Sequence, residues 1–83
     1  MELMDTIDLM ISDDYRDRFK AEYWQTKIRY DKLHHTLIKH EAGTLDFDLD
    51  CPVEALTQQA HYMGNYLKML EIRAEIEHID LAK

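Results

Sequence analysis

The chain has little of what small secreted domains depend on. Its 83 residues contain one cysteine, Cys51, which cannot form an internal disulfide. Small secreted domains are commonly held together by several disulfides, so that class is excluded. The start of the chain has no basic segment followed by an apolar run, and no stretch is long and apolar enough for a membrane helix. We therefore expect a soluble cytosolic protein with no membrane partner.

Glycine and proline are also scarce. Two glycines and one proline are too few for the turns of a β-sandwich, whereas 46% hydrophobic residues are too many for a disordered chain. This composition favours a few long helices. A chain of this length buries only about 60% of the surface that its unfolded form exposes. Small domains without disulfides or metals often complete their burial by oligomerising, and we expect the same here.

Basic residues are fewer than acidic ones and are unevenly placed. The net charge is −7, yet residues 15–40 carry seven Lys and Arg against three acids. Residues 1–14 carry five acids and no base, and residues 41–83 carry nine acids against three bases. An acidic protein therefore contains one basic helix, so its mean charge alone misleads about anionic partners.

Three segments have helical periodicity. In residues 1–11 the apolar positions follow one helix face: Leu3, Met4, Ile7, Met10 and Ile11. This helix is too short to be stable alone and must dock on its own chain or on a neighbour. Residues 13–40 carry a longer stripe: Phe19, Tyr23, Thr26, Tyr30, Leu33 and Leu37. Ser12 is its predicted N-cap, and Gly43 is placed to end it.

The segment from Gly43 to Asp50 alternates apolar and acidic residues. It has no partner strand, so we expect an extended connection whose leucines and Phe47 pack against the helices. Pro52 suits the first position of another helix, with Cys51 or Asp50 as the cap, and residues 52–79 continue a three-four apolar repeat. The sequence therefore predicts one all-α domain over residues 1–83, an antiparallel hairpin of two long helices preceded by a short one.

Two groups of residues suggest chemistry that their surroundings do not support. Cys51 at a helix start is a candidate nucleophile, but no histidine lies nearby in sequence to act as its base. Asp31, His34, His35 and His40 form a histidine-rich run without a second ligand pair elsewhere. Zinc requires three or four ligands in closed geometry, so a solvated cluster is the preferred interpretation. We expect no catalytic residue, no metal and no cofactor.

Aromatic and basic residues interleave along the first long helix. Tyrosine and tryptophan rings can stack on bases while lysine and arginine contact phosphates. The alternative is that the rings face the core and the cations face solvent. Tyr15 stands at the helix start, where a ring is easily exposed and where free backbone N–H groups suit a phosphate.

Two stretches resemble a known family. The segments "DYRDRFKAEYWQTKIRYDKL" and "DCPVEALTQQAHYMGNYLKMLEIRAEIE" are similar to the helical-hairpin domain of phage anti-CBASS and anti-Thoeris sponges. The shared features are a Tyr and an Arg that open the first long helix, an apolar-Lys pattern along it, a Cys-Pro that starts the second, and an Arg near its end. The resemblance covers roughly residues 14–79.

The resemblance implies a function and a set of site residues. Members of this family bind cyclic dinucleotides or trinucleotides made by bacterial immune systems and withhold them from their effectors, as hexamers with ligand pockets between protomers. It implies that residues 1–11 are an oligomerisation helix, that Tyr15 stacks on a base and that Lys27 pairs with a phosphate. Lys32 or Arg18 are alternatives to Lys27, and Arg73 would serve a second pocket for larger cyclic oligonucleotides.

We therefore expect a non-enzymatic sponge that acts in the cytoplasm of the infected bacterial host and has no affinity for duplex nucleic acid. Two alternatives remain. The acids of residues 1–14 and 41–50 also suit a nucleic-acid mimic that inhibits a host defence enzyme, and a helical assembly adaptor without a ligand has the same periodicity.

Overall fold

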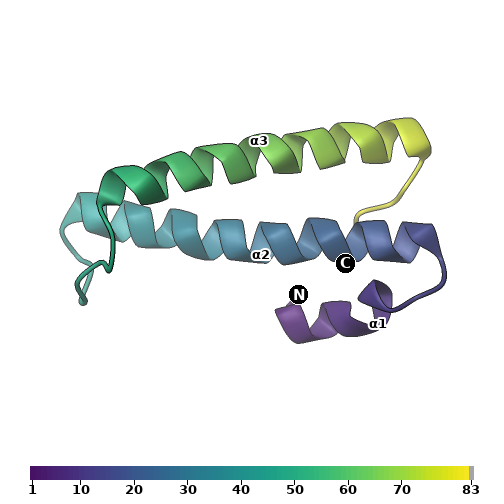
Figure 1. The fold of residues 1–83 in the computed structure, drawn as a ribbon, viewed down its shortest axis with the longest axis horizontal. Helices are drawn as coiled ribbons and strands as arrows, with labels where there is room; N and C mark the ends of the chain where they lie inside the picture. Colours follow the sequence, from purple (N-terminus) through teal and green to yellow (C-terminus); the bar gives the residue numbers. More distant parts are fainter. Residues whose placement is uncertain (83) are drawn as a thin grey trace.

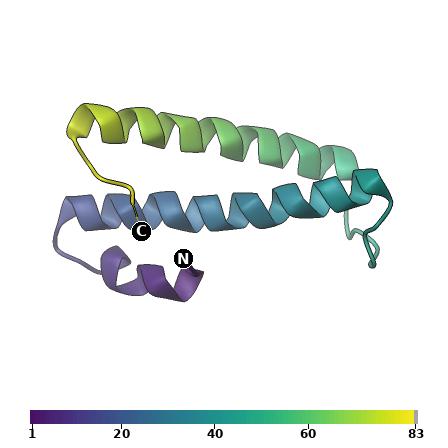
Figure 2. The same cartoon turned by 180° about the vertical axis from the view of Figure 1, so that it is seen from behind.

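Two long helices make up most of the molecule (Figure 1). A computed structural model describes residues 1–82, so Lys83 of the predicted domain lies outside the described residues. Helix α2 spans Tyr15–Ala42 and helix α3 spans Val53–Glu77. The two lie side by side and run in opposite directions in both views (Figures 1 and 2). Residues 1–82 contain no strand, so the predicted all-α class is confirmed.

Helix α2 begins two residues later than predicted. Its N-cap is Asp14, whose carboxylate accepts a hydrogen bond from the Arg16 backbone N–H at 2.9 Å. The prediction of Ser12 as the cap was therefore wrong. The Ser12 hydroxyl instead accepts from the Asp14 N–H at 3.1 Å and donates to the Asp17 carboxylate at 2.9 Å. Ser12 therefore orders the turn that precedes the helix, and an acid next to the positive helix end makes the stronger cap.

The prediction that Gly43 ends the first long helix is confirmed. Gly43 has a φ of 78°, in the left-handed region that suits glycine, and its N–H donates to the His40 carbonyl. The connection that follows packs less tightly than expected. Leu45 and Leu49 are half-buried, but Phe47 is 57% exposed. The expectation that Phe47 seals this end was wrong. Alternation places Phe47 on the same side as the two leucines, but more than half of the residue stays exposed to solvent.

Helix α3 begins one residue later than predicted. Pro52 is the N-cap itself rather than the first helical residue, and its carbonyl accepts from the Ala55 N–H at 3.1 Å. Neither Cys51 nor Asp50 caps the helix, and the Cys51 thiol is exposed. A proline with a φ of −58° and extended ψ at this position fixes the direction in which the chain enters the helix.

The end of α3 is a chain reversal. His78 adopts the left-handed conformation with a φ of 57°, and the Ile79 N–H bonds to the Ala74 carbonyl at 2.9 Å. The predicted helix to residue 79 therefore stops at Glu77. The chain then turns back toward α2, which buries Ile79 and places the Leu81 carbonyl 2.9 Å from the Trp24 indole nitrogen.

The N-terminal segment packs on α2 of its own chain. It consists of a 3-10 helix η1, Leu3–Thr6, and one turn of α-helix α1, Ile7–Met10. Leu3, Thr6 and Leu9 point inward at a spacing of three, whereas Met4, Ile7, Met10 and Ile11 are exposed. The expected apolar stripe is thus not the docking face, because a helix that starts with three residues per turn presents every third residue to its support.

The core lies in the seam between α2 and α3. Phe19 and Tyr23 of α2 meet Leu67, Leu70 and Ala74 of α3, and Ile79 closes the cluster from the chain reversal. Leu70 is only 2% exposed. No helix of residues 1–82 has the length and apolarity needed to span a membrane.

Candidate functional site

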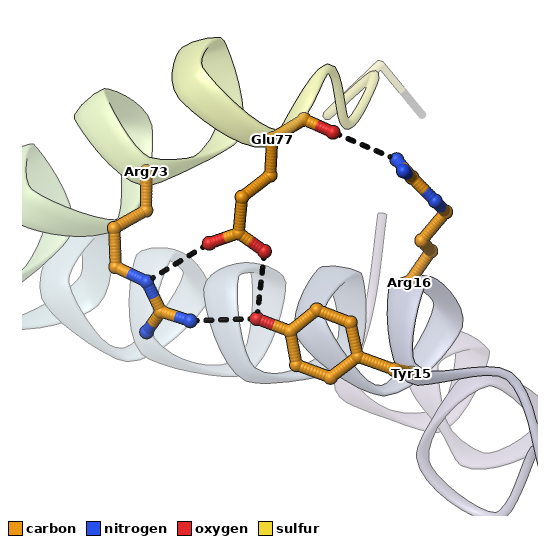
Figure 3. A network of polar contacts seen from close by, with 4 residues as sticks. All are labelled: Tyr15, Arg16, Arg73 and Glu77. Carbon is orange, nitrogen blue, oxygen red and sulfur yellow. Dashed lines mark hydrogen bonds and ion pairs between the residues drawn. The ribbon is translucent and has the colours of Figure 1, made fainter.

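The first residue of α2 and the last turns of α3 form a polar cluster (Figure 3). We define the Tyr15 cluster as Tyr15, Arg16, Arg73 and Glu77. The Tyr15 hydroxyl accepts a hydrogen bond from Arg73 Nη2 at 2.6 Å and donates one to Glu77 Oε1 at 2.9 Å. Arg73 Nε also pairs with Glu77 Oε2 at 3.3 Å. The phenol therefore uses both of its hydrogen-bonding functions on charged partners.

The antiparallel packing of α2 and α3 explains this cluster. Arg73 and Glu77 are one turn apart on α3, so their side chains lie on the same helix face. The opposite direction of α2 brings its first residue to the last turns of α3 (Figure 3). The Arg73 guanidinium also lies over the Phe19 ring, 5.0 Å from its centroid, and Tyr15 contacts that ring edge-on at 6.1 Å. The buried Phe19 ring therefore packs against both the Arg73 and the Tyr15 side chains.

Arg16 has a different role from Arg73. Its Nη1 atom donates to the backbone carbonyls of Glu77 at 3.0 Å and of His78 at 3.1 Å. These carbonyls lie at the C-terminal end of α3, where the last turn has no partners of its own and the helix dipole favours a cation. Arg16 therefore fastens the start of α2 to the end of α3 and holds the cluster in place.

The Tyr15 cluster is open to solvent. Tyr15 is 46% exposed, and the side chains of Arg73 and Glu77 are 48% and 31% exposed. An exposed ring next to an arginine fork can stack on a flat ligand and bind an anionic group bidentately. The Glu77 carboxylate currently occupies the position next to Arg73, so an anionic ligand would compete with an internal carboxylate.

The start of α2 is not a free anion site. The Asp14 carboxylate already accepts from the Arg16 N–H, and Asp13 and Asp17 stand beside it. The expectation of free N–H groups that suit a phosphate was therefore wrong at this helix end. The acids of the preceding turn satisfy the helix dipole.

Of the predicted site residues, the fold brings only Tyr15 and Arg73 together. Lys27 lies twelve residues further along α2, about 18 Å from Tyr15 along the helix axis. Its amine pairs with Asp31 at 3.0 Å and lies 5.9 Å from the Tyr30 ring centroid. Lys32 is exposed still further along, and Arg18 Nη1 donates to the Ser12 carbonyl at 2.7 Å, which ties it to the N-terminal turn.

Sequence reasoning missed Glu77 and Arg16. The spacing of Arg73 and Glu77 is a signal for an ion pair on one helix, but it does not reveal that Tyr15 joins the pair from the other helix. Two further tyrosine–glutamate pairs cross the same seam. Tyr23 donates to Glu71 at 2.8 Å and Tyr66 donates to Glu22 at 2.8 Å.

These hydrogen bonds change the acidity of two phenols. Burial, followed by the bond to Glu71, raises the pKa of Tyr23 to about 12. The bond to Glu22 is the main cause that raises the pKa of Tyr66. Both phenols therefore stay protonated at neutral pH and act as hydrogen-bond donors to a carboxylate.

A cavity of about 650 Å³ lies at the opposite end of the two helices. Its wall includes the Tyr30 ring, which stacks on His34 with centroids 5.8 Å apart. The remaining lining residues are Leu37, Ile38, His40, Glu41, Val53, Thr57, Ala60 and His61. The size is typical of small-molecule sites, but three histidines and one acid provide no fixed positive charge. Within residues 1–82, no three His, Cys, Asp or Glu side chains converge on a position for a metal ion.

The fold and the Tyr15 cluster define a small helical protein with an exposed tyrosine–arginine surface. The chain belongs to the Sequestin family, whose model matches residues 13–76. That match includes α2, the connection and all but the last residue of α3, and thus Tyr15 and Arg73 of the cluster. Neither curated proteins nor solved structures give a significant match to this chain.

Proposed function

We propose that this protein is a phage counter-defence sponge that binds cyclic oligonucleotide messengers of bacterial immunity and withholds them without cleaving them. Membership of the Sequestin family, whose name is compatible with sequestration, supports a binding function. The resemblance to anti-CBASS and anti-Thoeris sponges supplies the ligand class and the setting, which is the cytoplasm of the infected host.

The observation that carries the proposal is the exposed Tyr15 ring held beside Arg73. In this proposal the ring stacks on a base of the messenger, and the Arg73 guanidinium exchanges the Glu77 carboxylate for a phosphate. Because the guanidinium is already oriented by Phe19 and Tyr15, little conformational entropy is lost when the phosphate binds. Within one protomer the other predicted cations do not complete the same site. Lys27 and Lys32 lie too far along α2, and Arg18 is hydrogen-bonded to the Ser12 carbonyl.

The proposal includes assembly. The net charge of −7 opposes anion binding by a single chain unless cationic segments converge. A homo-oligomer, a hexamer by the family resemblance, would bring the basic α2 helices of several copies together. Lys27 and Lys32 of one copy would then contribute to pockets between protomers.

Calorimetric titration of the purified protein tests the ligand class. The panel contains cyclic dinucleotides, cyclic trinucleotides and a linear dinucleotide as the control for ring closure. We expect heat of binding with at least one cyclic member, and recovery of that nucleotide with unchanged mass after the protein is denatured. Flat titrations across the panel would contradict the sponge, and a changed nucleotide mass would contradict binding without cleavage.

Two variants locate the site. Arg73→Gln keeps the length of the side chain and removes its charge, and we expect at least tenfold weaker binding. Lys68→Gln is the matched control, because Lys68 is an exposed cation on the same helix and none of the hydrogen bonds and ion pairs found within residues 1–82 involves its side chain. Equal losses in the two variants would mean that the total charge, not the Tyr15 cluster, determines the affinity.

A further inference from the structure

The cavity between α2 and α3 is separate from the Tyr15 cluster. It lies at the hairpin end of the molecule, where residues 43–52 join the two helices (Figure 1). Tyr15 opens α2 at the other end, roughly 22 Å along the helix axis from Tyr30 in the cavity wall. The cavity volume of about 650 Å³ is within the range of about 300–1,000 Å³ that is common for small-molecule sites.

The cavity exists because α3 contributes mainly small side chains at this end. Toward the opposite end, large side chains fill the seam, as where Phe19 meets Leu67. At the hairpin end the α3 residues in the wall include Val53, Thr57 and Ala60. Packed helices have axes about 8–10 Å apart, and such short side chains leave part of that distance unfilled. The space is therefore a consequence of the sequence of α3.

One wall of the cavity is flat and aromatic. Tyr30 and His34 are one turn apart on α2, and their rings are nearly parallel, at 10°, with centroids 5.8 Å apart. Rings at that separation are offset, so part of each ring face stays uncovered. Tyr30 also lies against α3, since a Cβ added at Gly64 would stand 3.4 Å from its Cε1 atom. The pair thus provides a surface on which a planar ligand can stack.

The hairpin end of the chain is negatively charged. Residues 33–67 contain one Lys or Arg, Lys39, and five acids: Glu41, Asp46, Asp48, Asp50 and Glu54. The cavity wall found within residues 1–82 includes Glu41 but no Lys or Arg. Lys27, whose amine lies 5.9 Å from the Tyr30 ring centroid, is paired with Asp31 and is not part of the wall. The local charge therefore favours a cationic ligand over an anionic one.

Glu41 is available to such a ligand. Within residues 1–82, no hydrogen bond or ion pair involves its carboxylate. A carboxylate of this kind accepts charge-assisted hydrogen bonds from an ammonium group and repels a phosphate. The first turn of α3 also faces this end, where free N–H groups attract anions, but Glu54 already stands in that turn.

We propose that the cavity binds a small planar aromatic amine in its cationic form, with the ring stacked on Tyr30 and His34 and the ammonium group bonded to the Glu41 carboxylate. His34 and Glu41 are seven residues apart on one face of α2, roughly 10 Å along its axis. A ring with a two-carbon amine arm spans this distance together with the reach of the glutamate side chain. The inference goes beyond the proposed function and does not depend on it, because this ligand has the opposite charge to a cyclic oligonucleotide.

Calorimetric titration of the full chain with three indoles tests the ligand class. Tryptamine has the ring and a cationic arm, indole has the ring alone, and indole-3-acetate has the ring and an anionic arm. We expect tryptamine to bind about tenfold more tightly than indole, because it adds a charge-assisted hydrogen bond. We expect no measurable heat from indole-3-acetate. Flat titrations for all three, equal affinities, or tightest binding of the anion would each overturn the inference.

Two glutamate variants test the position of the ammonium group. Glu41→Gln should lower the affinity for tryptamine to that for indole and leave the binding of indole unchanged. Glu54→Gln is the matched control, because it removes the same charge at the same end from an exposed residue outside the cavity wall. We expect it to retain the affinity for tryptamine. Equal losses in the two variants would overturn the role of Glu41 in favour of the overall charge of this end.

A histidine pair tests the stacking surface. His34→Ala should weaken the binding of both tryptamine and indole, whereas His35→Ala, at an exposed position outside the cavity wall, should leave both unchanged. Circular dichroism verifies that each variant keeps its helices. Unchanged affinities in His34→Ala would contradict the stacked position of the ring. Arg73→Gln should not change the binding of tryptamine, so the cavity and the Tyr15 cluster stand or fall by separate measurements.

Discussion

The hydroxyl of Tyr23 on α2 donates a 2.8 Å hydrogen bond to the Glu71 carboxylate on α3. The Tyr23 side chain is part of the core, with only 7% of the residue exposed, so this bond links the two long helices at the edge of their apolar seam. A buried phenol next to a carboxylate resists ionisation, because the phenolate would lose its hydration and face a like charge.

The Tyr23–Glu71 pair predicts a loss of stability at high pH. The pKa of Tyr23 is raised to about 12 in the folded state from 10.0, so below pH 10 its contribution is fully present. As pH rises from 10 to 12, the unfolded chain releases the Tyr23 proton first and the free energy of unfolding falls. Urea denaturation at several pH values measures this fall.

Tyr23→Phe isolates the contribution of this phenol. At neutral pH we expect the variant to be less stable by about 1 kcal/mol, the typical net value of one hydrogen bond. The difference between wild type and variant should shrink as pH rises through 10 to 12, because only the wild type loses the proton-linked term. A difference that stays constant over this range would contradict the raised pKa.

Leu70 carries a large share of the core stability. Its side chain is 2% exposed in the middle of the α2–α3 seam. Leu70→Ala should lower the free energy of unfolding by about 2–5 kcal/mol, since the cavity is flanked by two long helices that cannot easily collapse into it. The exposed Ile38 provides a control, for which Ile38→Ala should change stability by no more than about 0.5 kcal/mol. Chemical denaturation measures the free energy of unfolding of both variants. A much larger loss for Leu70→Ala than for Ile38→Ala would show that burial in the core, and not the removal of apolar atoms as such, determines the cost.

The two glycines should respond in opposite ways to alanine. Gly43 ends α2 with a φ of 78°, so Gly43→Ala forces an L side chain into the left-handed region and should cost about 1 kcal/mol. Gly64 lies inside α3, where an added Cβ would stand 3.4 Å from Tyr30 Cε1, an ordinary contact. Gly64→Ala should therefore stabilise by up to about 1 kcal/mol through helix propensity. Thermal melts that shift in the same direction would contradict this assignment.

Thr6 should control the docking of the N-terminal segment. It is 1% exposed, donates to the Leu3 carbonyl at 2.7 Å and accepts from Gln25 Nε2 at 3.0 Å. Thr6→Val keeps the shape but leaves the Gln25 amide without this partner, at a cost of about 1–2 kcal/mol. We expect faster hydrogen exchange in residues 3–10 while the amides of α3 remain protected. Thr57→Val is the control, because Thr57 is an exposed threonine on α3. Equal effects of both variants on hydrogen exchange in residues 3–10 would argue against a specific role for Thr6.

The periodicity of the sequence was sufficient to predict the long helices, the place of Gly43 and the all-α class. Apolar residues at steps of three and four over many turns leave few alternatives to a helix. The ends were less certain, as the Asp14 cap and the reversal at His78 show. A cap depends on which of several neighbouring polar side chains reaches an N–H group, and sequence spacing alone does not decide that.

The N-terminal segment and the candidate site show what the sequence could not determine. The choice of Leu3, Thr6 and Leu9 as the docking face follows from a 3-10 turn, which the stripe of Met4, Ile7, Met10 and Ile11 did not indicate. Tyr15 and Arg73 are 58 residues apart in sequence, and only the antiparallel packing of α2 on α3 brings them within 2.6 Å. Local periodicity thus determined the helices, whereas the register between them, set by burial of Phe19, Tyr23 and Leu70, decided which charged side chains meet.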